Sequence, residues 1–373
     1  MLLPLQGVRV LDLSRTFPGA WCTRLLSDLG AEVIRVEAPG VGDMLRGPTG
    51  STPAHVGLNR GKRSVTLDTR SSSGIEVLRR LVVTADAVVD SAPPATRAAA
   101  GFGYPQAAEL NPRLVWVGLS AFGLDGPYAG RAGHEITFLG HSGALTAIAG
   151  QLPWVPQTPI AAPLAGAVAS AALSAALTAA ARTGSGCLLD VSIDDAATWL
   201  LAASPGRFAG IDSDAGWAAG RRLYRCADDR WVTVAAAEAR TWHALCRVLD
   251  ADDLVDRLWA DEDEQVTMAE RFEKVFATRP AADWVAVGSA ATIGPVNDGV
   301  QLVDDPHVSA RGTLVDIAGT LVPAAPFRLG AAGERQPAPP TGLPTLGEDT
   351  DDILRAAGVS DEELAQLRAT GTI

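Results

Sequence analysis

Residues 8–36, VRVLDLSRTFPGAWCTRLLSDLGAEVIRV, decide the fold because two apolar runs flank an amphipathic stretch. Residues 8–13 and 32–36 are short, mostly apolar segments of the kind that form buried strands. The leucines between them recur at helical spacing, and Gly30 stands where a helix C-cap is expected. A strand, a helix and a second strand in this order predict a βαβ unit with parallel strands.

The same alternation of strand and helix patterns continues along the chain. The further predicted elements are strands at 64–67, 87–89 and 114–119, a helix at 74–83, an alanine-rich helix at 161–181 and a strand at 187–191. Repeated βα units of this kind predict an α/β fold built on an open, doubly wound, Rossmann-like parallel sheet.

The chain has 373 residues, which is more than one typical domain holds, so two domains are predicted. A large domain is expected over 1–202. Residues 203–222 are rich in Gly, Ser and Asp and have the composition of a linker. A second unit is expected from 223, with a strand at 231–234, and the last predicted helix lies near 361–369.

Composition excludes several classes of function. Lys and Arg number 31 against 43 Asp and Glu, which gives a formal net charge of −12, so general nucleic-acid binding is not expected. The N-terminus lacks the basic and apolar regions of a signal peptide. The apolar segment 161–181 is mostly alanine and is interpreted as a buried helix. We therefore expect a cytoplasmic protein with no membrane partner.

Cysteine and histidine spacing predicts neither a disulfide framework nor a metal site. The four cysteines contain no C-x-x-C pair, and the five histidines contain no H-x-x-x-H or H-E-x-x-H arrangement. No G-x-G-x-x-G follows the first strand and no Walker A sequence is present. From the residues alone the chain is a two-domain α/β protein with the organisation of an enzyme.

Three segments carry a resemblance to a known family. They are GVRVLDLSRTFPGAWCTRLLSDLGAEVIRVEAPGVGDMLRG at 7–47, LNRGKRSVTLDTRSSSGIEVLRRLVVTADAVVD at 58–90 and NPRLVWVGLSAFGLDGPYAGRAGHEITFLGHSGAL at 111–145. Together and in this order they resemble the family III (CaiB/BaiF-type) CoA-transferases. This family also contains the α-methylacyl-CoA racemases, and GHEITF looks closest to that branch.

The resemblance implies an architecture and a substrate. It implies a large Rossmann-like domain, a small α/β domain over 223–310, and a return segment over 311–373 whose C-terminal helix packs on the large domain. It also implies a homodimer in which the two chains thread through one another as interlocked rings. The implied substrate is coenzyme A, bound as an acyl thioester.

Four basic residues are candidates for binding coenzyme A. Arg35 lies in the second predicted strand, and Arg60, Lys62 and Arg63 lie in the segment NRGKRS. Arginine and lysine form charge-assisted hydrogen bonds with phosphate groups, and the resemblance places these positions near the adenine-nucleotide end of the ligand. The alternative interpretation is a basic surface cluster without a ligand.

Two further residues are catalytic candidates through the resemblance. His134 matches the racemase histidine, and an imidazole suits removal or return of the α-proton beside a thioester. Glu238 matches a glutamate that supports this histidine by fixing its tautomer. The alternatives are a helix-capping or buried histidine and an acid favoured at a helix N-terminus.

The sequence departs from the family where an aspartate acts as nucleophile or second acid–base. The matching position falls on or near 161–163, and no Asp or Glu occurs between Ile136 and Leu189. A second departure is DSAPPAT at 90–96, which replaces an arginine-bearing turn and leaves Arg97 nearby.

The expected function is therefore racemase-like α-proton chemistry on an acyl-CoA, with one base or an atypical arrangement. Two alternatives stay open. The first is a CoA-transferase that uses a relocated carboxylate, with Glu135 and Asp190 as the nearest in sequence. The second is a non-catalytic homologue that binds CoA thioesters.

Overall fold

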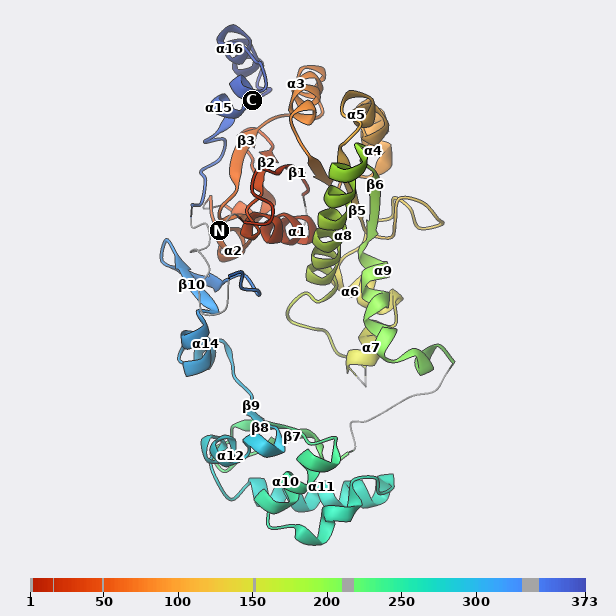
Figure 1. Ribbon diagram of the computed structural model, residues 1–373, viewed down its shortest axis with the longest axis vertical. Coiled ribbons are helices and arrows are strands. Elements are labelled where there is room, and N and C mark those ends of the chain that lie inside the picture. The colour runs from red at the N-terminus through yellow and green to blue at the C-terminus, as the bar shows by residue number, and fades with distance from the viewer. Residues whose placement is uncertain (1–2, 16, 49, 150–151, 210–217, 331–341) are drawn as a thin grey trace. The chain divides into compact units, whose positions relative to one another are not determined.

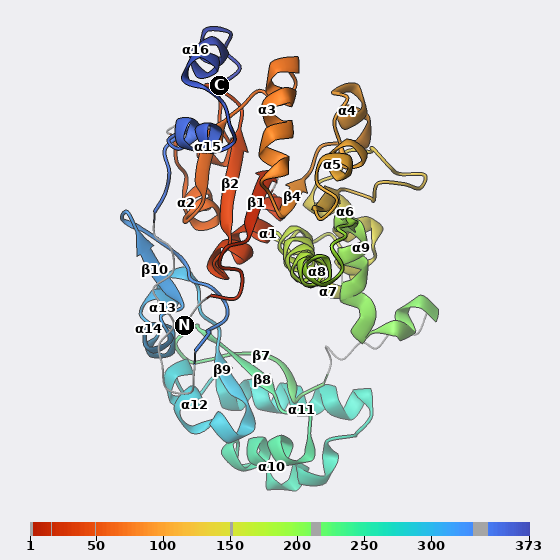
Figure 2. The same cartoon turned by 45° about the horizontal axis from the view of Figure 1, so that its top comes forward.

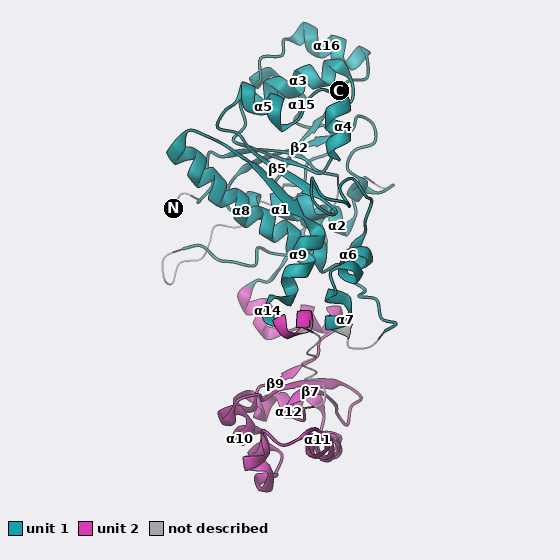
Figure 3. Cartoon of the chain, turned by 90° about the vertical axis from the view of Figure 1, so that its right-hand side faces the viewer, with its two compact units in different colours: residues 1–203, 312–373 teal, residues 204–311 magenta. Residues whose placement is uncertain are grey.

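The computed structural model describes residues 3–15, 17–48, 50–149, 152–209, 218–330 and 342–373. Its backbone contacts divide the chain into two compact units (Figure 3). Unit 1 comprises residues 1–203 and 312–373, and unit 2 comprises residues 204–311. The chain thus leaves unit 1, forms unit 2, and returns to unit 1.

Unit 1 is built on a six-stranded parallel sheet (Figure 1). Its strands are β1 (Arg9–Leu13), β2 (Glu32–Glu37), β3 (Arg63–Thr66), β4 (Ala87–Asp90), β5 (Val115–Ser120) and β6 (Leu188–Ser192). Their order is β3-β2-β1-β4-β5-β6, which is the order of the Rossmann fold. The predicted α/β fold with a parallel sheet is confirmed, and all six predicted strands agree with the observed ones to within one residue at each end.

Helices cover both faces of this sheet because side chains alternate between the faces along each strand. Val10 and Val33 pack with α1 (Phe17–Asp28) and α8 (Ala161–Thr183) on one face. Leu11 and Ile34 pack on the other face, with α3 (Ser72–Val83), α5 (Tyr104–Leu110), α15 (Thr350–Ala356) and α16 (Asp361–Ala369) (Figure 3). The strands β1, β2, β4 and β5 are buried along nearly their whole length, which explains their largely apolar sequences, whereas the edge strand β6 exposes Leu188 and Asp190.

The remaining helices and strands of unit 1 are short. They are α2 (Pro53–Asn59), α3 (Ser72–Val83), α4 (Pro94–Ala99), α5 (Tyr104–Leu110), α6 (Glu135–His141), α7 (Ala144–Ala149), α9 (Ile193–Trp199), β10 (Leu314–Ile317), β11 (Thr320–Pro323), α15 (Thr350–Ala356) and α16 (Asp361–Ala369). Three 3₁₀ turns lie at Met44–Arg46, Leu200–Ala203 and Pro205–Ala209, the last within unit 2.

Helix α8 crosses α1 at very short range. By length and composition α8 could span a membrane, yet Ala165, Ala169 and Leu173 are fully buried against neighbouring elements of unit 1. At Gly166 an added Cβ would lie 2.6 Å from the carbonyl oxygen of Pro18 and 2.6 Å from the Cβ of Trp21. A glycine at this position therefore allows the two helices to pack.

Unit 2 combines a three-stranded antiparallel sheet with helices. Its elements are β7 (Arg221–Arg225), β8 (Trp231–Ala235), β9 (Ile293–Pro295), α10 (Ala239–Val248), α11 (Glu262–Phe276), α12 (Ala281–Val287), α13 (Gly299–Val303) and α14 (Pro306–Arg311), with 3₁₀ turns at Asp252–Arg257 and Ser289–Ala291. Its core contains the fully buried rings of Tyr224, Trp242, Phe272 and Phe276. Strand β7 begins inside the segment 203–222 that was predicted as a linker, and residues 210–217 of that segment lie outside the described residues.

Candidate functional site

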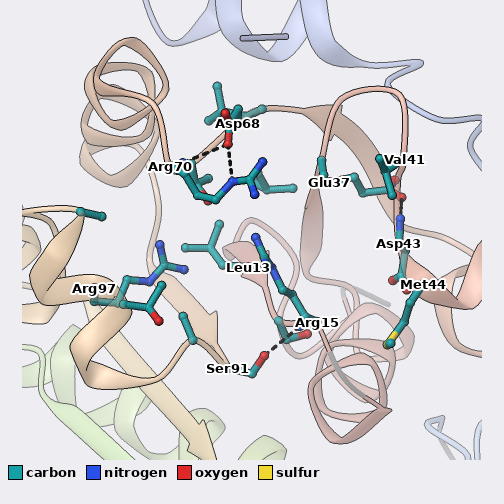
Figure 4. A pocket seen from close by; sticks show the side chains of 18 of the residues that line it. Leu13, Arg15, Glu37, Val41, Asp43, Met44, Asp68, Arg70, Ser91 and Arg97 are labelled. Carbon is teal, nitrogen blue, oxygen red and sulfur yellow. Dashed lines mark hydrogen bonds and ion pairs between the residues drawn. The ribbon is translucent and has the colours of Figure 1, made fainter. Parts of the chain in front are cut away.

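A cavity of about 890 Å³ opens at the carboxyl ends of β1, β2, β3 and β4 (Figure 4). Its walls are the last residues of β1 and β2, the segments that follow the four strands, and helix α4 (Pro94–Ala99). The sheet order reverses between β1 and β4, and open α/β sheets bind ligands in the crevice at such a point. The fold therefore places this cavity where a ligand is expected.

Three arginines point into the cavity from different elements (Figure 4). Arg15 follows β1, is exposed, and its guanidinium forms no salt bridge within the described part of the chain. Arg70 follows β3 and forms a 3.0 Å ion pair with Asp68. Arg97 lies in α4 and holds the buried Asp90 carboxylate through two bonds of 2.7 and 2.6 Å. Guanidinium groups gathered in this way suit a ligand with several phosphates.

Arg35 lines the same cavity from β2, but it is buried and its charge is matched. Its Nη1 lies 2.7 Å from Asp12 and its Nη2 lies 2.5 Å from Asp43. Burial acts to lower the pKa of Arg35, but the two carboxylates outweigh burial and raise it. The Arg35 Nε is buried and has no hydrogen-bond partner among the residues that the structure describes. Arg35 thus links the segments that carry Asp12 and Asp43 in the cavity wall, and its Nε–H is a donor without a partner in the described part of the chain.

Lys62 lies inside unit 1 and does not line the cavity. Its Nζ is 2.8 Å from Thr23 Oγ1, 2.9 Å from Asn59 Oδ1 and 3.2 Å from Asp12 Oδ2. Burial lowers the pKa of Lys62 to about 8, although Asp12 acts in the opposite direction. Burial acts to raise the pKa of Asp12, but the nearby Arg35 and Lys62 outweigh it and lower the pKa to about 2.

Arg60 and Arg63 also form ion pairs within the protein. Arg60 is fully buried, with its Nη1 3.4 Å from Asp28 Oδ1. Arg63 bonds Glu32 and Asp349, each at 2.9 Å. Of the four basic residues predicted to bind coenzyme A, only Arg35 lines the cavity. A binding role for the other three remains a prediction from the resemblance.

Sequence reasoning did not single out Arg15 and Arg70, and it noted Arg97 only as displaced from the family position. A usable signal was present, because Arg15 comes two residues after the predicted strand 8–13 and Arg70 comes three residues after 64–67. Residues that follow neighbouring parallel strands meet at one edge of the sheet.

His134 lies elsewhere in unit 1, as the N-cap residue of α6. It is exposed, and its imidazole has no hydrogen-bond partner among the described residues. Helix α6 follows the long loop after β5 and contacts α8 and α9. An exposed, unpaired imidazole is available to a ligand, so its predicted role as a proton-transfer base stays open as a prediction.

The first turn of α8 contains residues 161–163, where the resemblance places the family aspartate. Its residues there are Ala161, Ala162 and Pro163, so it supplies no carboxylate of its own. The carboxylate of Glu135 reaches this turn from α6, accepting the backbone N–H groups of Ile160 and Ala161 at 2.6 Å and of Ala162 at 3.1 Å. The other nearby acid, Asp190, accepts the backbone N–H of Leu124 at 2.9 Å.

Glu238 belongs to unit 2, whereas His134 belongs to unit 1. Glu238 is the N-cap residue of α10, and its Oε2 accepts a 3.0 Å hydrogen bond from Thr241 Oγ1. Glu238 therefore lies at a helix N-terminus, as the alternative interpretation of this residue expected. Its predicted support of His134 remains a prediction from the resemblance.

Comparison with known proteins assigns the family. Residues 5–350 match the model of CoA-transferase family III. The chain belongs to CoA-transferase family III. The resemblance noted in the sequence is thereby confirmed, and acyl-CoA enzymes of both racemase and transferase type are among the relatives.

The family III relatives align along almost the whole chain. The human alpha-methylacyl-CoA racemase is 30% identical over 388 residues, covering 98% of this chain and 97% of the relative. The human succinyl-CoA:glutarate CoA-transferase is 27% identical over 404 residues, covering 99% and 90%. The crystal structure of a CAIB/BAIF family protein from Brucella suis superimposes with a TM-score of 0.82 at 27% identity, covering 96% of this chain and 100% of that chain.

Proposed function

We propose that this protein is an acyl-CoA enzyme that performs racemase-like α-proton chemistry on a CoA thioester. The observation that carries the proposal is the cavity at the switch point of the sheet, into which Arg15, Arg70 and Arg97 converge. In this proposal the phosphates of coenzyme A bind these three arginines, and no metal takes part. The active form is a homodimer, as the family resemblance implies.

His134 is the proposed base. Its imidazole takes the α-proton of the acyl group, and the electron pair of the broken C–H bond moves into the thioester carbonyl to form an enolate. An exposed imidazole with no partner in the described residues can meet the substrate without first breaking an internal hydrogen bond. On the resemblance alone, Glu238 is the carboxylate that supports this histidine.

The proposal is tested by α-deuterium incorporation into 2-methylacyl-CoA thioesters in D₂O, followed by mass spectrometry. We expect exchange by the wild-type protein, and in His134→Gln a loss of roughly 100-fold or more for the enantiomer whose α-proton His134 removes, the scale of general acid–base catalysis. Coenzyme A affinity, measured by titration calorimetry, should stay unchanged in that variant. Wild-type protein that binds coenzyme A but exchanges no proton would contradict the proposal and leave the non-catalytic alternative.

A second candidate function is CoA transfer through Glu135. The observation that favours it is the Glu135 carboxylate at the first turn of α8, where the chain otherwise lacks an acid. In this reaction a carboxylate oxygen attacks the thioester carbon, the C–S bond breaks, and an acyl-glutamyl anhydride and free CoA thiolate form. Release of free CoA, together with borohydride-sensitive acylation that Glu135→Gln abolishes, would support transfer over α-proton chemistry.

A further inference from the structure

His141, the last residue of α6, forms a dyad with Asp194 of α9. The imidazole Nδ1 lies 3.0 Å from Asp194 Oδ1 and 2.9 Å from Asp194 Oδ2. The Asp194 side chain is 9% exposed, whereas the His141 side chain is 48% exposed. The contact therefore joins a fixed, buried carboxylate to an imidazole that remains accessible.

Hydrogen bonding sets the tautomer of His141. A carboxylate accepts and does not donate, so Nδ1 carries the proton and Nε2 keeps its lone pair. The Asp194 carboxylate has no other hydrogen-bond partner among the described residues, so an imidazolium formed at His141 would be the charge that balances it. An imidazole arranged in this way accepts a proton at Nε2 and returns it later.

Aromatic rings hold the orientation of the His141 ring. Phe122 meets it edge-on with the ring centroids 5.7 Å apart, and Tyr128 lies 5.2 Å away at 57°. The Arg131 guanidinium covers the Tyr128 ring at 4.0 Å. Phe122 and Tyr128 both come from the loop after β5, at the carboxyl edge of the sheet. The dyad is thus built into the same edge of unit 1 as the switch-point cavity.

His134 and His141 occupy the two ends of one helix. They are seven residues apart on α6, which corresponds to roughly 10 Å along the axis. Between Ile136 and Leu189 the chain has no acid, and the Glu135 carboxylate is already bound by three backbone N–H groups. Among the described residues near α6, His141 therefore has two features that a proton-transfer group needs. Its Nε2 has no hydrogen-bond partner there, and the Asp194 carboxylate orients its ring.

The geometry points to His141, positioned by Asp194, as the second proton-transfer group of the proposed α-proton chemistry, in place of the missing family aspartate. This inference rests on the proposed function. One imidazole takes the α-proton, so a C–H bond breaks and an N–H bond forms. The other, as imidazolium, protonates the enolate carbon on the opposite face. After one inversion the two rings have exchanged protonation states, and exchange with solvent restores them.

The test uses the two enantiomers of a 2-methylacyl-CoA, incubated separately in D₂O with the full-length protein. Wild-type protein is expected to exchange the α-proton of both enantiomers and to invert them. His141→Gln should lose exchange from one enantiomer and lose inversion, each by roughly 100-fold or more, while exchange from the other enantiomer continues. His134→Gln should show the opposite preference. The exposed His307 on α14 supplies the matched control, His307→Gln, which should behave as wild type.

The outcomes separate this inference from the proposed function. Equal exchange from both enantiomers in His141→Gln, or wild-type exchange from one enantiomer without inversion, would overturn the role of His141 and leave the proposed function intact. No exchange in the wild-type protein would overturn both. Unchanged circular dichroism and coenzyme A affinity would show that each variant is folded.

A measurement that does not depend on activity tests Asp194 as a positioning residue. Long-range ¹H–¹⁵N correlation spectra of ¹⁵N-histidine protein distinguish the two imidazole tautomers. The His141 resonance should show the Nδ1–H form in the wild type and a shift toward the Nε2–H form in Asp194→Asn. That variant should also lower kcat with little change in KM. An Nε2–H tautomer in the wild-type protein would overturn the assignment.

Discussion

The carboxylate of Glu135 accepts the backbone N–H of Ala161 over 2.6 Å, which joins the start of α6 to the start of α8. The first four N–H groups of a helix have no partner within the helix. In most helices the residue just before the first turn supplies the capping oxygen, but here Ile160 stands there and makes no side-chain cap. Glu135 therefore caps α8 from a different helix.

Replacing Glu135 should weaken this junction. We expect Glu135→Ala to lower the free energy of unfolding by about 1–2 kcal/mol, because three backbone N–H donors lose a charged acceptor. Glu135→Gln should cost less, since its amide oxygen still accepts. Urea unfolding measures both. The exposed Glu109 gives a matched control, and Glu109→Ala should change the unfolding free energy by less than about 0.5 kcal/mol. Equal values for the two alanine variants would contradict the capping role.

Arg15 offers a clean probe of the cavity because no salt bridge in the described residues depends on it. Arg15→Ala should raise the Kd for coenzyme A about tenfold, the loss expected for one charge-assisted contact, without changing stability. Arg97→Ala should weaken binding as well, but it should also destabilise unit 1, since it leaves the buried Asp90 carboxylate unpaired. Calorimetric titration with coenzyme A and thermal melting separate the two effects. An unchanged Kd in Arg15→Ala would place the phosphates elsewhere.

His55 predicts a loss of stability in mild acid. It is buried on α2, and burial, aided by the nearby Arg46, lowers its pKa from 6.5 to about 4. The unfolded chain therefore binds more protons than the folded chain between these values, so stability falls as the pH drops through this range. Between pH 7 and pH 5 the contribution of His55 should fall by about 2 kcal/mol. Urea unfolding of His55→Gln at both pH values should show a smaller difference than wild type; an equal difference would assign the acid sensitivity to other groups.

Gly166 should tolerate no larger residue. A Cβ at this position would lie 2.6 Å from backbone and side-chain atoms of α1, and the backbone oxygen cannot move without shifting that helix. Gly166→Ala should therefore lower the melting temperature, through a destabilisation of about 1–3 kcal/mol. Gly140 in α6 has open space around its Cβ position, so Gly140→Ala is the matched control and should leave the melting temperature unchanged or raise it. Equal stability of the two variants would contradict the close crossing of α1 and α8.

The sheet could be predicted because its central strands are buried on both faces and therefore leave largely apolar runs, as at residues 115–119 in β5. The residues that line the cavity were harder to predict, because a basic residue gives the same sequence pattern whether it faces a ligand or an internal acid. Lys62 and Arg60 turned inward toward Asp12 and Asp28, which lie 50 and 32 residues away in the chain. The His141–Asp194 pair spans 53 residues, so no local spacing could reveal it.

Unit 1 is made of two chain segments, and the second of them is synthesised after unit 2. Ile353, Leu354 and Leu367 complete the core over α3 and β3, and Asp349 bonds the backbone N–H of Ser64 at 2.9 Å. A ribosome makes these residues only after it has synthesised all of unit 2. Unit 2 can thus fold during translation while one apolar face of the six-stranded sheet is not yet covered by α15 and α16. A ribosome that stalls between the two segments would release a chain with a finished insert and an open, aggregation-prone sheet.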